Sequence, residues 1–409
     1  MKALVSTAAV AALLLALTSG LPAEAATPLP SGGTGLSSSS KSAVKFQSAA
    51  PSISRLSGGD RYETAVAISR QFPAGVPVVY IATGAGYADA LSAAPAAAAQ
   101  GGPLLTTARN VLPQAVAAEI KRLKPQKIVV AGGAGAVSGS VLTALKKLAP
   151  SVQRLGGSDR YETSRLLIDY AFDSAPIAYL ATGRNFPDAL SASAAAGSIG
   201  APVILVDGKQ RKVDKSTTAL IRDLGVSRIN IAGGTGVISS GIESTLKNTM
   251  SVKRLSGSDR YSTSAAINRY AFSSASTAYF AVGTGFADAL AGAALAGKSG
   301  SPLYVVARTC VSSAVKDDVN ALGLERRVML GGSAVLTSAV GKLTVCAKPA
   351  PKPAAPSNPG DSKNCSDFST YASAQAWYKK YFPKYGDIAR LDYDNDGYAC
   401  ETLPGGPAS

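Results

Sequence analysis

The sequence RLSGGDRYET at residues 55–64 recurs as RLGGSDRYET at 154–163 and as RLSGSDRYST at 254–263. A second block follows each copy: ATGAGYADAL at 82–91, ATGRNFPDAL at 181–190 and AVGTGFADAL at 281–290. A third block places two glycines after an apolar run, at Gly132-Gly133, Gly233-Gly234 and Gly331-Gly332. The blocks keep their order at a spacing of about 100 residues, the size of a small domain rather than of a solenoid unit. The chain therefore contains three similar small domains in tandem.

Within the first repeat, apolar runs alternate with helical patterns. Asp60 is expected to cap a helix whose apolar residues Ala65, Ile68 and Phe72 share one face. Runs at 78–82, 103–106 and 128–131 predict strands, and stretches from about 89, from 112 to 123 and from 141 to 148 predict helices. Continuous apolar strands separated by helices are typical of a parallel sheet covered on both faces. Each repeat is therefore predicted to be a small Rossmann-like α/β unit.

Composition divides the chain into eight segments. Residues 1–25 have the basic residue, the short apolar run and the Ala23-Glu24-Ala25 site of a secretory signal peptide. A membrane anchor is the alternative, but the apolar run is short for a span. The other segments are a Ser/Gly-rich lead-in (26–53), three repeats (54–151, 152–251, 252–346), a Pro/Ala/Lys-rich linker (347–363), a small domain (364–403) and a tail (404–409). We expect an exported protein with no membrane span in its mature form.

The formal net charge is +15, and a charge of this size attracts polyanions over long distances. Outside a cell, the available polyanions are polymers that carry phosphate or uronate groups, and anionic lipid. Nucleic acid is not expected, because only 6% of the residues are aromatic. The sequence contains no histidine, so it lacks the commonest general base and the commonest zinc ligand. This argues against an enzyme, although Ser-Lys and paired-carboxylate schemes stay open.

The four cysteines are Cys310, Cys346, Cys365 and Cys400. An even number in an exported chain indicates disulfides, and three connectivities are possible. The domain division favours one bridge in each domain, Cys310–Cys346 and Cys365–Cys400.

Each repeat carries two arginines near a glycine-rich turn and a helix start. Guanidinium groups form bidentate contacts with phosphate and carboxylate, and three weak sites would give avidity for a repeating polymer. In the alternative interpretation each arginine pairs with an aspartate and locks a turn or an interface. The adjacent aspartate favours this scaffold role for the second arginine of each pair. The six candidates are Arg55 and Arg61, Arg154 and Arg160, and Arg254 and Arg260.

Two other features of the repeats have a structural and a catalytic interpretation. Asp89, Asp188 and Asp288 each precede Ala-Leu and a helix of small residues, so a helix-cap role is favoured over a catalytic one. The Gly-Gly turns do not complete a dinucleotide-binding fingerprint. We expect them to be turns that need a close backbone approach.

The segment DYDNDGYACE at 392–401 begins like an EF-hand loop. The carboxylates of Asp392, Asp394 and Asp396 alternate along the chain, Gly397 permits the sharp turn, and the carbonyl of Tyr398 can be the next ligand. The usual acid at the twelfth position is replaced by Leu403, and Glu401 comes two positions earlier. An acidic, solvated turn is the alternative, but it leaves the glycine at the sixth position unexplained.

The three repeated blocks resemble the cell-wall-binding repeat 2 family over about residues 54–346. The resemblance implies a pseudo-threefold arrangement that binds an anionic wall polymer without a covalent bond. The segment at about 364–403, with Cys365 before the acidic loop, resembles the Excalibur extracellular calcium-binding domain. This second resemblance implies Ca²⁺ as the cofactor and Asp392, Asp394, Asp396 and Glu401 as its ligands.

These observations predict a secreted, non-catalytic surface protein of a Gram-positive cell wall, whose partner is a teichoic-acid-like polymer or another secondary wall polysaccharide. A wall hydrolase or amidase, or a modifier of one, is the first alternative. Binding to a host protein, lipid or DNA, and self-assembly into a surface layer, are the others.

Overall fold

The computed structural model describes residues 50–347 and 357–407. The predicted signal peptide and most of the predicted lead-in and linker lie outside these ranges. Among the residues described, no helix is long and apolar enough to cross a membrane. Hydrophobic side chains form two clusters, one within residues 65–343 and one within residues 374–400. We call residues 50–347 the repeat body and residues 357–407 the C-terminal domain.

Strands and helices alternate through the repeat body. The first repeat contains β1 (Ser52–Leu56), α1 (Arg61–Ser69), β2 (Val78–Thr83), α2 (Ala88–Ala99), β3 (Leu104–Thr107), α3 (Gln114–Leu123), β4 (Lys127–Ala131) and α4 (Gly139–Leu145). The second contains β5 (Ser151–Leu155), α5 (Arg160–Ala171), β6 (Ile177–Thr182), α6 (Pro187–Ser198), β7 (Val203–Val206), α7 (Lys215–Asp223), β8 (Arg228–Ala232) and α8 (Ser240–Lys247). The third contains β9 (Ser251–Leu255), α9 (Arg260–Ala271), β10 (Thr277–Val282), α10 (Ala287–Lys298), β11 (Leu303–Val306), α11 (Ser313–Ala321), β12 (Arg326–Leu330) and α12 (Ser338–Gly341). The strands and helices predicted for the first repeat are confirmed, apart from small shifts at their ends.

Strand β1 is not among the predicted elements. Its residues Ser52, Ile53 and Ser54 are exposed, so the strand has no continuous apolar run to reveal it.

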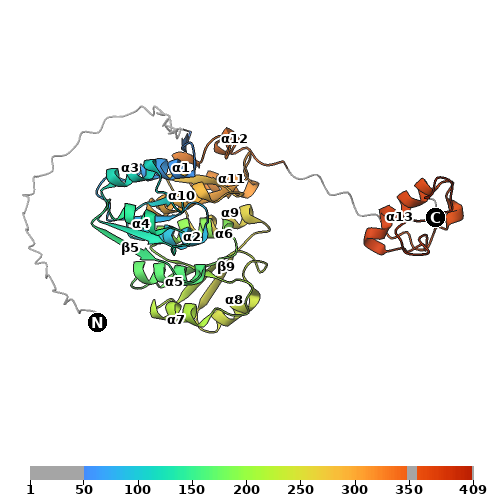
Figure 1. Ribbon diagram of the computed structural model, residues 1–409, viewed down its shortest axis with the longest axis horizontal. Coiled ribbons are helices and arrows are strands. Elements are labelled where there is room, and N and C mark those ends of the chain that lie inside the picture. Colours follow the sequence, from blue (N-terminus) through green and yellow to red (C-terminus); the bar gives the residue numbers. More distant parts are fainter. Residues whose placement is uncertain (1–49, 348–356, 408–409) are drawn as a thin grey trace, which may run out of the picture. The chain divides into compact units, whose positions relative to one another are not determined.

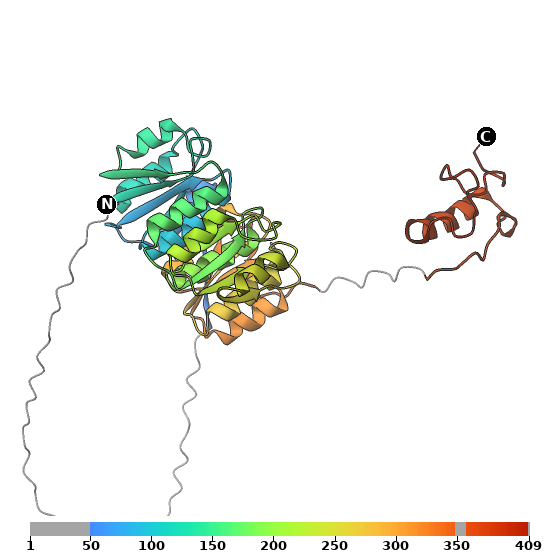
Figure 2. The same cartoon turned by 90° about the horizontal axis from the view of Figure 1, so that it is seen from below.

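The strands form three parallel four-stranded sheets, with the orders β1-β12-β10-β11, β3-β2-β4-β5 and β7-β6-β8-β9. Helices lie on both sides of the strands (Figures 1 and 2), and the predicted α/β class is confirmed. Each sheet takes one strand from the next repeat: β5 pairs with β4, and β9 pairs with β8. The predicted boundaries at 151/152 and 251/252 separate the repeats in the sequence. The sheet that contains β5 extends across the first boundary, and the sheet that contains β9 extends across the second.

The first strand of the chain completes the last sheet. Strand β1 pairs with β12 in a parallel register that runs from Ser52 opposite Arg326 to Leu56 opposite Leu330. The three repeats therefore form a closed ring in which each repeat contributes a strand to a neighbouring sheet.

Helices α2, α6 and α10 pack against one another in the middle of the ring (Figure 1). Glycine and alanine make this close approach possible, because a Cβ atom at Gly197 would lie 3.0 Å from the Cβ of Ala98 and 3.1 Å from the Cα of Gly297. At one end of the three helices the rings of Tyr87, Phe186 and Phe286 meet, with centroids 5.5–5.6 Å apart. The predicted pseudo-threefold arrangement is confirmed.

The C-terminal domain consists of a short 3₁₀ helix η1 (Cys365–Asp367), helix α13 (Tyr371–Tyr385) and the acidic loop. Its small core contains Ala374, Tyr378, Leu391 and Ala399. Disulfides join Cys310 to Cys346 and Cys365 to Cys400, the pairing that the domain division favours.

Candidate functional site

Each repeat begins its first helix with the same aspartate. The carboxylate of Asp60 accepts hydrogen bonds from the backbone N–H groups of Tyr62 and Glu63, and Asp159 and Asp259 cap α5 and α9 in the same way. The predicted cap at Asp60 is confirmed. This aspartate is used in capping, and the arginine that follows it contacts another part of the repeat.

That arginine contacts the glycine that follows the central strand of its repeat. Arg61 donates to the carbonyl of Gly84 at 2.6 Å, Arg160 to Gly183 at 2.7 Å and Arg260 to Gly283 at 2.5 Å. Each guanidinium also attracts the aspartate of the preceding repeat in the ring: Asp288, Asp89 and Asp188, respectively. These contacts agree with the scaffold interpretation, in which the arginine pairs with an aspartate and locks a turn or an interface.

The other three predicted arginines hold the Gly-Gly turns. Arg55 donates to the carbonyls of Gly331 and Leu336, Arg154 to those of Gly132 and Ser138, and Arg254 to those of Gly233 and Ser239. Arg254 also forms an ion pair with Glu243 at 2.8 Å. All six predicted arginines thus donate to backbone carbonyls at the ends of strands, and their contact with a polymer stays a prediction.

The helix-cap prediction for Asp89, Asp188 and Asp288 is wrong. The N-cap positions of α2, α6 and α10 are Tyr87, Phe186 and Phe286, and none of these three residues makes a side-chain capping hydrogen bond. The aspartates lie two residues after these N-cap positions, in the first turn of each helix. They face the interface between repeats, where burial raises their pKa values and the facing arginine partly offsets this. For Asp188, the pKa rises to about 6.

These aspartates also explain the glycine turns. Gly132 has φ 110°, which favours glycine, and a Cβ there would lie within 2.4 Å of a carboxylate oxygen of Asp89. Gly233 and Gly331 have the same relation to Asp188 and Asp288. The predicted close backbone approach is confirmed.

Two interfaces between repeats contain a pocket. The first, of about 640 Å³, lies between the first and third repeats and is lined by Arg61, Thr64, Phe286, Asp288, Arg308 and the turn at 332–335. The second, of about 390 Å³, lies between the second and third repeats and is lined by Asn185, Asp188, Asp259, Arg260 and the turn at 234–237. We call them pocket 1 and pocket 2.

Pocket 1 contains an arginine that is not among the six predicted arginines. The side chain of Arg308 is exposed and makes no hydrogen bond or ion pair with any residue in the described ranges. Arg109 occupies the same position of the first repeat, after β3, so a comparison of the repeats beyond the three blocks could have found both.

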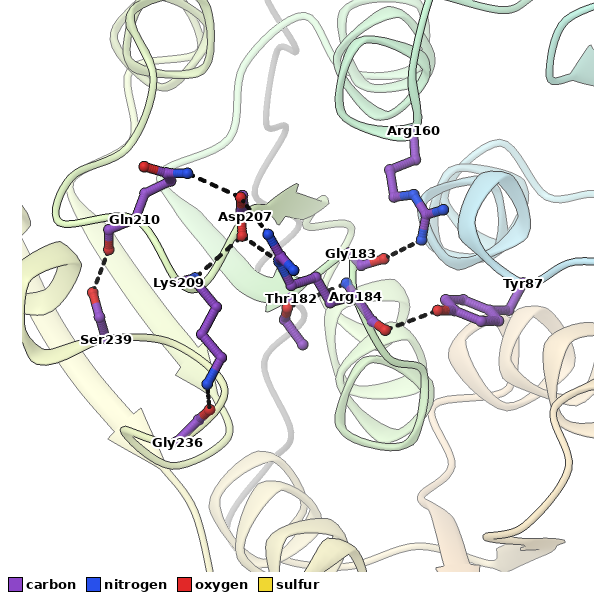
Figure 3. A network of polar contacts seen from close by, with 10 residues as sticks. All are labelled: Tyr87, Arg160, Thr182, Gly183, Arg184, Asp207, Lys209, Gln210, Gly236 and Ser239. Atoms are coloured by element: carbon purple, nitrogen blue, oxygen red, sulfur yellow. Dashed lines mark hydrogen bonds and ion pairs between the residues drawn. The ribbon is translucent and has the colours of Figure 1, made fainter.

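The second repeat contains an ion pair beside its contact with the first repeat (Figure 3). Arg184 contacts Asp207 through two nitrogens, at 2.5 and 3.0 Å, and this pairing holds the pKa of Asp207 well below its usual range. The hydroxyl of Tyr87 donates to the carbonyl of Arg184 at 2.9 Å. Ala85 and Thr284 stand at the position of Arg184 in the other repeats, so this ion pair distinguishes the second repeat.

The acidic loop of the C-terminal domain brings three predicted ligands together. Asp392, Asp394 and Asp396 each offer a carboxylate oxygen, and these oxygens lie within 4.8 Å of one another. Gly397 has φ 95°, as a sharp turn requires. Three convergent carboxylates on a turning loop fit a hard cation such as Ca²⁺.

The buried carboxylate of Asp392 is held by neighbours. It accepts hydrogen bonds from the hydroxyl of Tyr378 and the N–H of Gly397, both at 2.9 Å, and from the N–H of Asp396 at 3.2 Å. Burial opposes ionisation, but these hydrogen bonds prevail and lower the pKa of Asp392. The carboxylate is therefore in the charged form that a cation needs.

Glu401 does not belong to the group of three. Desolvation and then the nearby carboxylates of Asp396, Asp394 and Asp392 raise its pKa, so it lies within electrostatic range of the loop. The side chain of Tyr398 is exposed, and its carbonyl is the part that was predicted to bind the cation.

Comparisons with known proteins match both parts of the chain. The model of the family described as "Cell wall binding domain 2 (CWB2)" matches residues 55–142, 154–243 and 254–341, and that of the "Excalibur calcium-binding domain" matches residues 362–401. In Bacillus subtilis (strain 168), the N-acetylmuramoyl-L-alanine amidase LytC is 30% identical over 289 residues, which are 71% of this chain and 57% of the amidase. An amidase enhancer of the same strain is 30% identical over 262 residues, which are 64% of this chain and 36% of the enhancer.

Solved structures of two Clostridium difficile proteins resemble the chain. Cwp6 matches with a TM-score of 0.65 and 29% identity over 72% of this chain and 48% of its own. Cwp8 matches with a TM-score of 0.66 and 28% identity over 71% of this chain and 51% of its own. The chain thus spans about half of each of these structures.

Proposed function

Because the chain belongs to the cell wall binding domain 2 family and carries an Excalibur calcium-binding domain, we propose that it is a secreted, non-catalytic protein that attaches non-covalently to an anionic cell-wall polymer. The partner is a teichoic-acid-like polymer or another secondary wall polysaccharide. The net charge of +15 favours such a partner over a neutral glycan.

The observation that carries this proposal is the arginine in pocket 1 that has no side-chain partner among the described residues. Arg308 lies in the same pocket as Arg61 and the start of α10, whose first N–H groups have no side-chain cap. A guanidinium and a helix N-terminus both attract phosphate and carboxylate groups. Pocket 1 therefore offers a place for one anionic group of the polymer.

The acidic groups of pocket 1 are engaged with other groups of the protein. Asp60 accepts hydrogen bonds from the first N–H groups of α1, and Asp288, whose pKa burial raises, is attracted by Arg61. Pocket 2 has Arg260 but two aspartates, Asp188 and Asp259, and no counterpart of Arg308 among its lining residues. We propose pocket 1 as the main contact, with the exposed basic surface of the ring adding weaker contacts along the polymer.

In the C-terminal domain we propose that Asp392, Asp394 and Asp396, with the carbonyl of Tyr398 and the carboxylate of Glu401, hold Ca²⁺. The ion would neutralise three crowded carboxylates and fix the loop between α13 and the Cys365–Cys400 disulfide. Extracellular sites of this kind bind at about 10⁻⁴–10⁻³ M, so external calcium would fill it.

A wall amidase, or a modifier of one, is the second candidate, because two relatives are named for amidase chemistry. Release of peptide or sugar from purified walls by the protein alone would favour an enzyme. Acceleration of an added amidase would favour a modifier.

Co-sedimentation with purified wall sacculi, before and after mild acid removal of the anionic polymer, tests the attachment. We expect capture that weakens with salt and is lost after stripping. Equal capture by stripped sacculi would point to peptidoglycan, and no capture would refute attachment. Arg308→Glu should weaken capture, whereas Arg228→Glu, an exposed charge reversal away from both pockets, should weaken it much less.

A further inference from the structure

Helix α13 brings aromatic residues, which are sparse in the chain, together with basic residues. Its second half reads WYKKYFPKY at 377–385, although only 6% of all residues are aromatic. Trp377, Lys380, Tyr381 and Lys384 are spaced at i, i+3, i+4 and i+7, so they share one face of the helix. We call these four residues the aromatic-lysine face.

The rings on this face form a continuous surface. The centroids of Trp377 and Tyr381 lie 4.7 Å apart, and Trp377 also meets Phe368 at 6.4 Å. The side chains of Trp377 and Tyr381 remain partly exposed, so the ring surface is accessible to a ligand.

The lysines beside the rings are free to pair with an anion. Lys380 lies with its Nζ atom 5.0 Å from the centroid of Tyr381, and Lys384 with its Nζ atom 4.8 Å from that of Tyr385. Both are exposed, and neither forms an ion pair with a carboxylate of the described residues. An ammonium next to an aromatic face is held in place by the ring and keeps its remaining N–H donors for a partner.

The acidic loop contacts α13 through residues outside the aromatic-lysine face. Gln375 donates to the carbonyl of Gly397 at 2.8 Å, and the hydroxyl of Tyr378 donates to Asp392. At 100° per residue, Gln375 lies about 160° and Tyr378 about 100° around the helix from Trp377. The calcium loop therefore contacts a different side of the helix from the aromatic-lysine face.

We propose that the aromatic-lysine face binds an acidic polysaccharide, with Lys380 and Lys384 contacting its anionic groups and Trp377 and Tyr381 contacting the apolar faces of its sugar or polyol units. Charge complementarity selects an anionic partner, and the partly exposed rings of Trp377 and Tyr381 select a chain that exposes C–H groups between its charges. The identity of the polymer as a wall component rests on the proposed function. Pocket 1 and the aromatic-lysine face would then be two separate contacts of the chain with the same polymer.

Trp377 is the single tryptophan of the sequence, so its fluorescence reports this face alone. The full chain, in calcium, would be titrated with polygalacturonate as a carboxylate polymer, glycerol teichoic acid as a phosphate polymer and dextran as a neutral polymer. We expect a saturable change of Trp377 emission with one or both acidic polymers, weakened by salt, and none with dextran. An equal response to dextran, or no response to either acidic polymer, would overturn the proposal.

Variants separate this face from the repeat body. The double variant Lys380→Ser/Lys384→Ser should weaken the fluorescence response by about three- to thirtyfold, while calcium binding and circular dichroism show that the domain is still folded. Lys379→Ser, an exposed lysine off this face, should leave the response unchanged. A response that survives the double variant would overturn the proposal.

The outcomes also distinguish this proposal from wall attachment. Co-sedimentation with sacculi without a change of Trp377 emission would refute the second surface and leave attachment intact. A change of emission with the acidic polymers but no capture by sacculi would refute attachment and keep the surface. Stronger binding of a single-stranded oligonucleotide than of either acidic polymer would reassign the face to nucleic acid and overturn the polysaccharide.

Discussion

Arg55 donates a 2.7 Å hydrogen bond to the carbonyl oxygen of Leu336, which lies 281 residues further along the chain. A second nitrogen of the same guanidinium donates to the carbonyl of Gly331. Both acceptors belong to the turn after β12, the strand that pairs with β1. One side chain near the beginning of the ring therefore holds the turn near its end, and the third sheet is complete only when the ring has closed.

Replacing Arg55 with alanine should destabilise the ring, because the carbonyls of Gly331 and Leu336 lose a charged donor in a partly buried place. We expect a loss of about 1–3 kcal/mol in the free energy of unfolding, measured by urea denaturation. Hydrogen exchange should show the largest loss of protection in β1 and β12.

Arg154→Ala is the matched control, since Arg154 makes the equivalent contacts to Gly132 and Ser138 within one stretch of chain. It should cost a similar free energy but expose β4 and β5 instead. Arg228→Ala, at an exposed site, should change stability by less than about 0.5 kcal/mol. Unchanged stability of Arg55→Ala would show that β1 alone closes the ring.

Much of the ring follows from its sequence, and the parts that do not follow depend on contacts between distant residues. Apolar runs locate strands such as β2 and β4, because buried parallel strands carry continuous apolar side chains. Asp60 is found as a cap because capping is local. Asp89 is misplaced as a cap because its surroundings come from Gly132 and from Arg160 of the next repeat.

The same reason explains what was missed at the candidate sites. Pocket 1 joins residues near 60 to residues near 285, 308 and 333, so no local pattern marks Arg308 as one of its members. The acidic loop is different, because Asp392, Asp394 and Asp396 are brought together by one short turn. A metal-binding loop can therefore be predicted from the sequence, whereas a pocket between repeats cannot.

The close packing of the central helices predicts a strong effect of size at Gly197. Valine there would press its side chain against Ala98 and the backbone of Gly297, and the rigid helices cannot move apart without disturbing all three repeats. We expect Gly197→Val to lower the free energy of unfolding by about 1–3 kcal/mol. Gly139→Val, at an exposed site where a Cβ meets nothing within 4 Å, is the control. Equal melting temperatures for the two variants would contradict a tight central contact.

Burial of Asp188 predicts a dependence of stability on pH. Its pKa is about 6 in the folded chain against an ordinary value of 3.8, so the folded state keeps a proton that the unfolded state has lost. Stability therefore falls as pH rises from about 4 to about 6, by on the order of 2–3 kcal/mol in full. Asp188→Asn removes this titration.

Urea denaturation at about pH 4 and pH 7.5 checks the prediction for Asp188. Relative to the original chain, Asp188→Asn should gain stability at the higher pH, whereas Asp173→Asn, at an exposed site, should show no such gain. A loss of stability at pH 7.5 would mean that the ionised carboxylate and Arg260 attract each other more strongly than burial penalises the charge.

The geometry of the acidic loop predicts a ranking of its ligands. Asp394 is exposed, so Asp394→Asn should weaken calcium binding by tenfold or more without unfolding the domain, since it removes one of the charges that converge on the ion. Asp392 also accepts hydrogen bonds from Tyr378 and Gly397, so Asp392→Ala should abolish binding and loosen the contact between the loop and α13.

Tyr393→Ser is the control, because this side chain lies between the two aspartates in sequence but is 98% exposed. Isothermal titration calorimetry gives the affinities, and near-ultraviolet circular dichroism reports the packing of Tyr378. Calcium binding that is unchanged in Asp394→Asn would show that Asp394 is not a ligand, and an original chain that does not bind calcium would show that the convergent carboxylates are only an acidic turn.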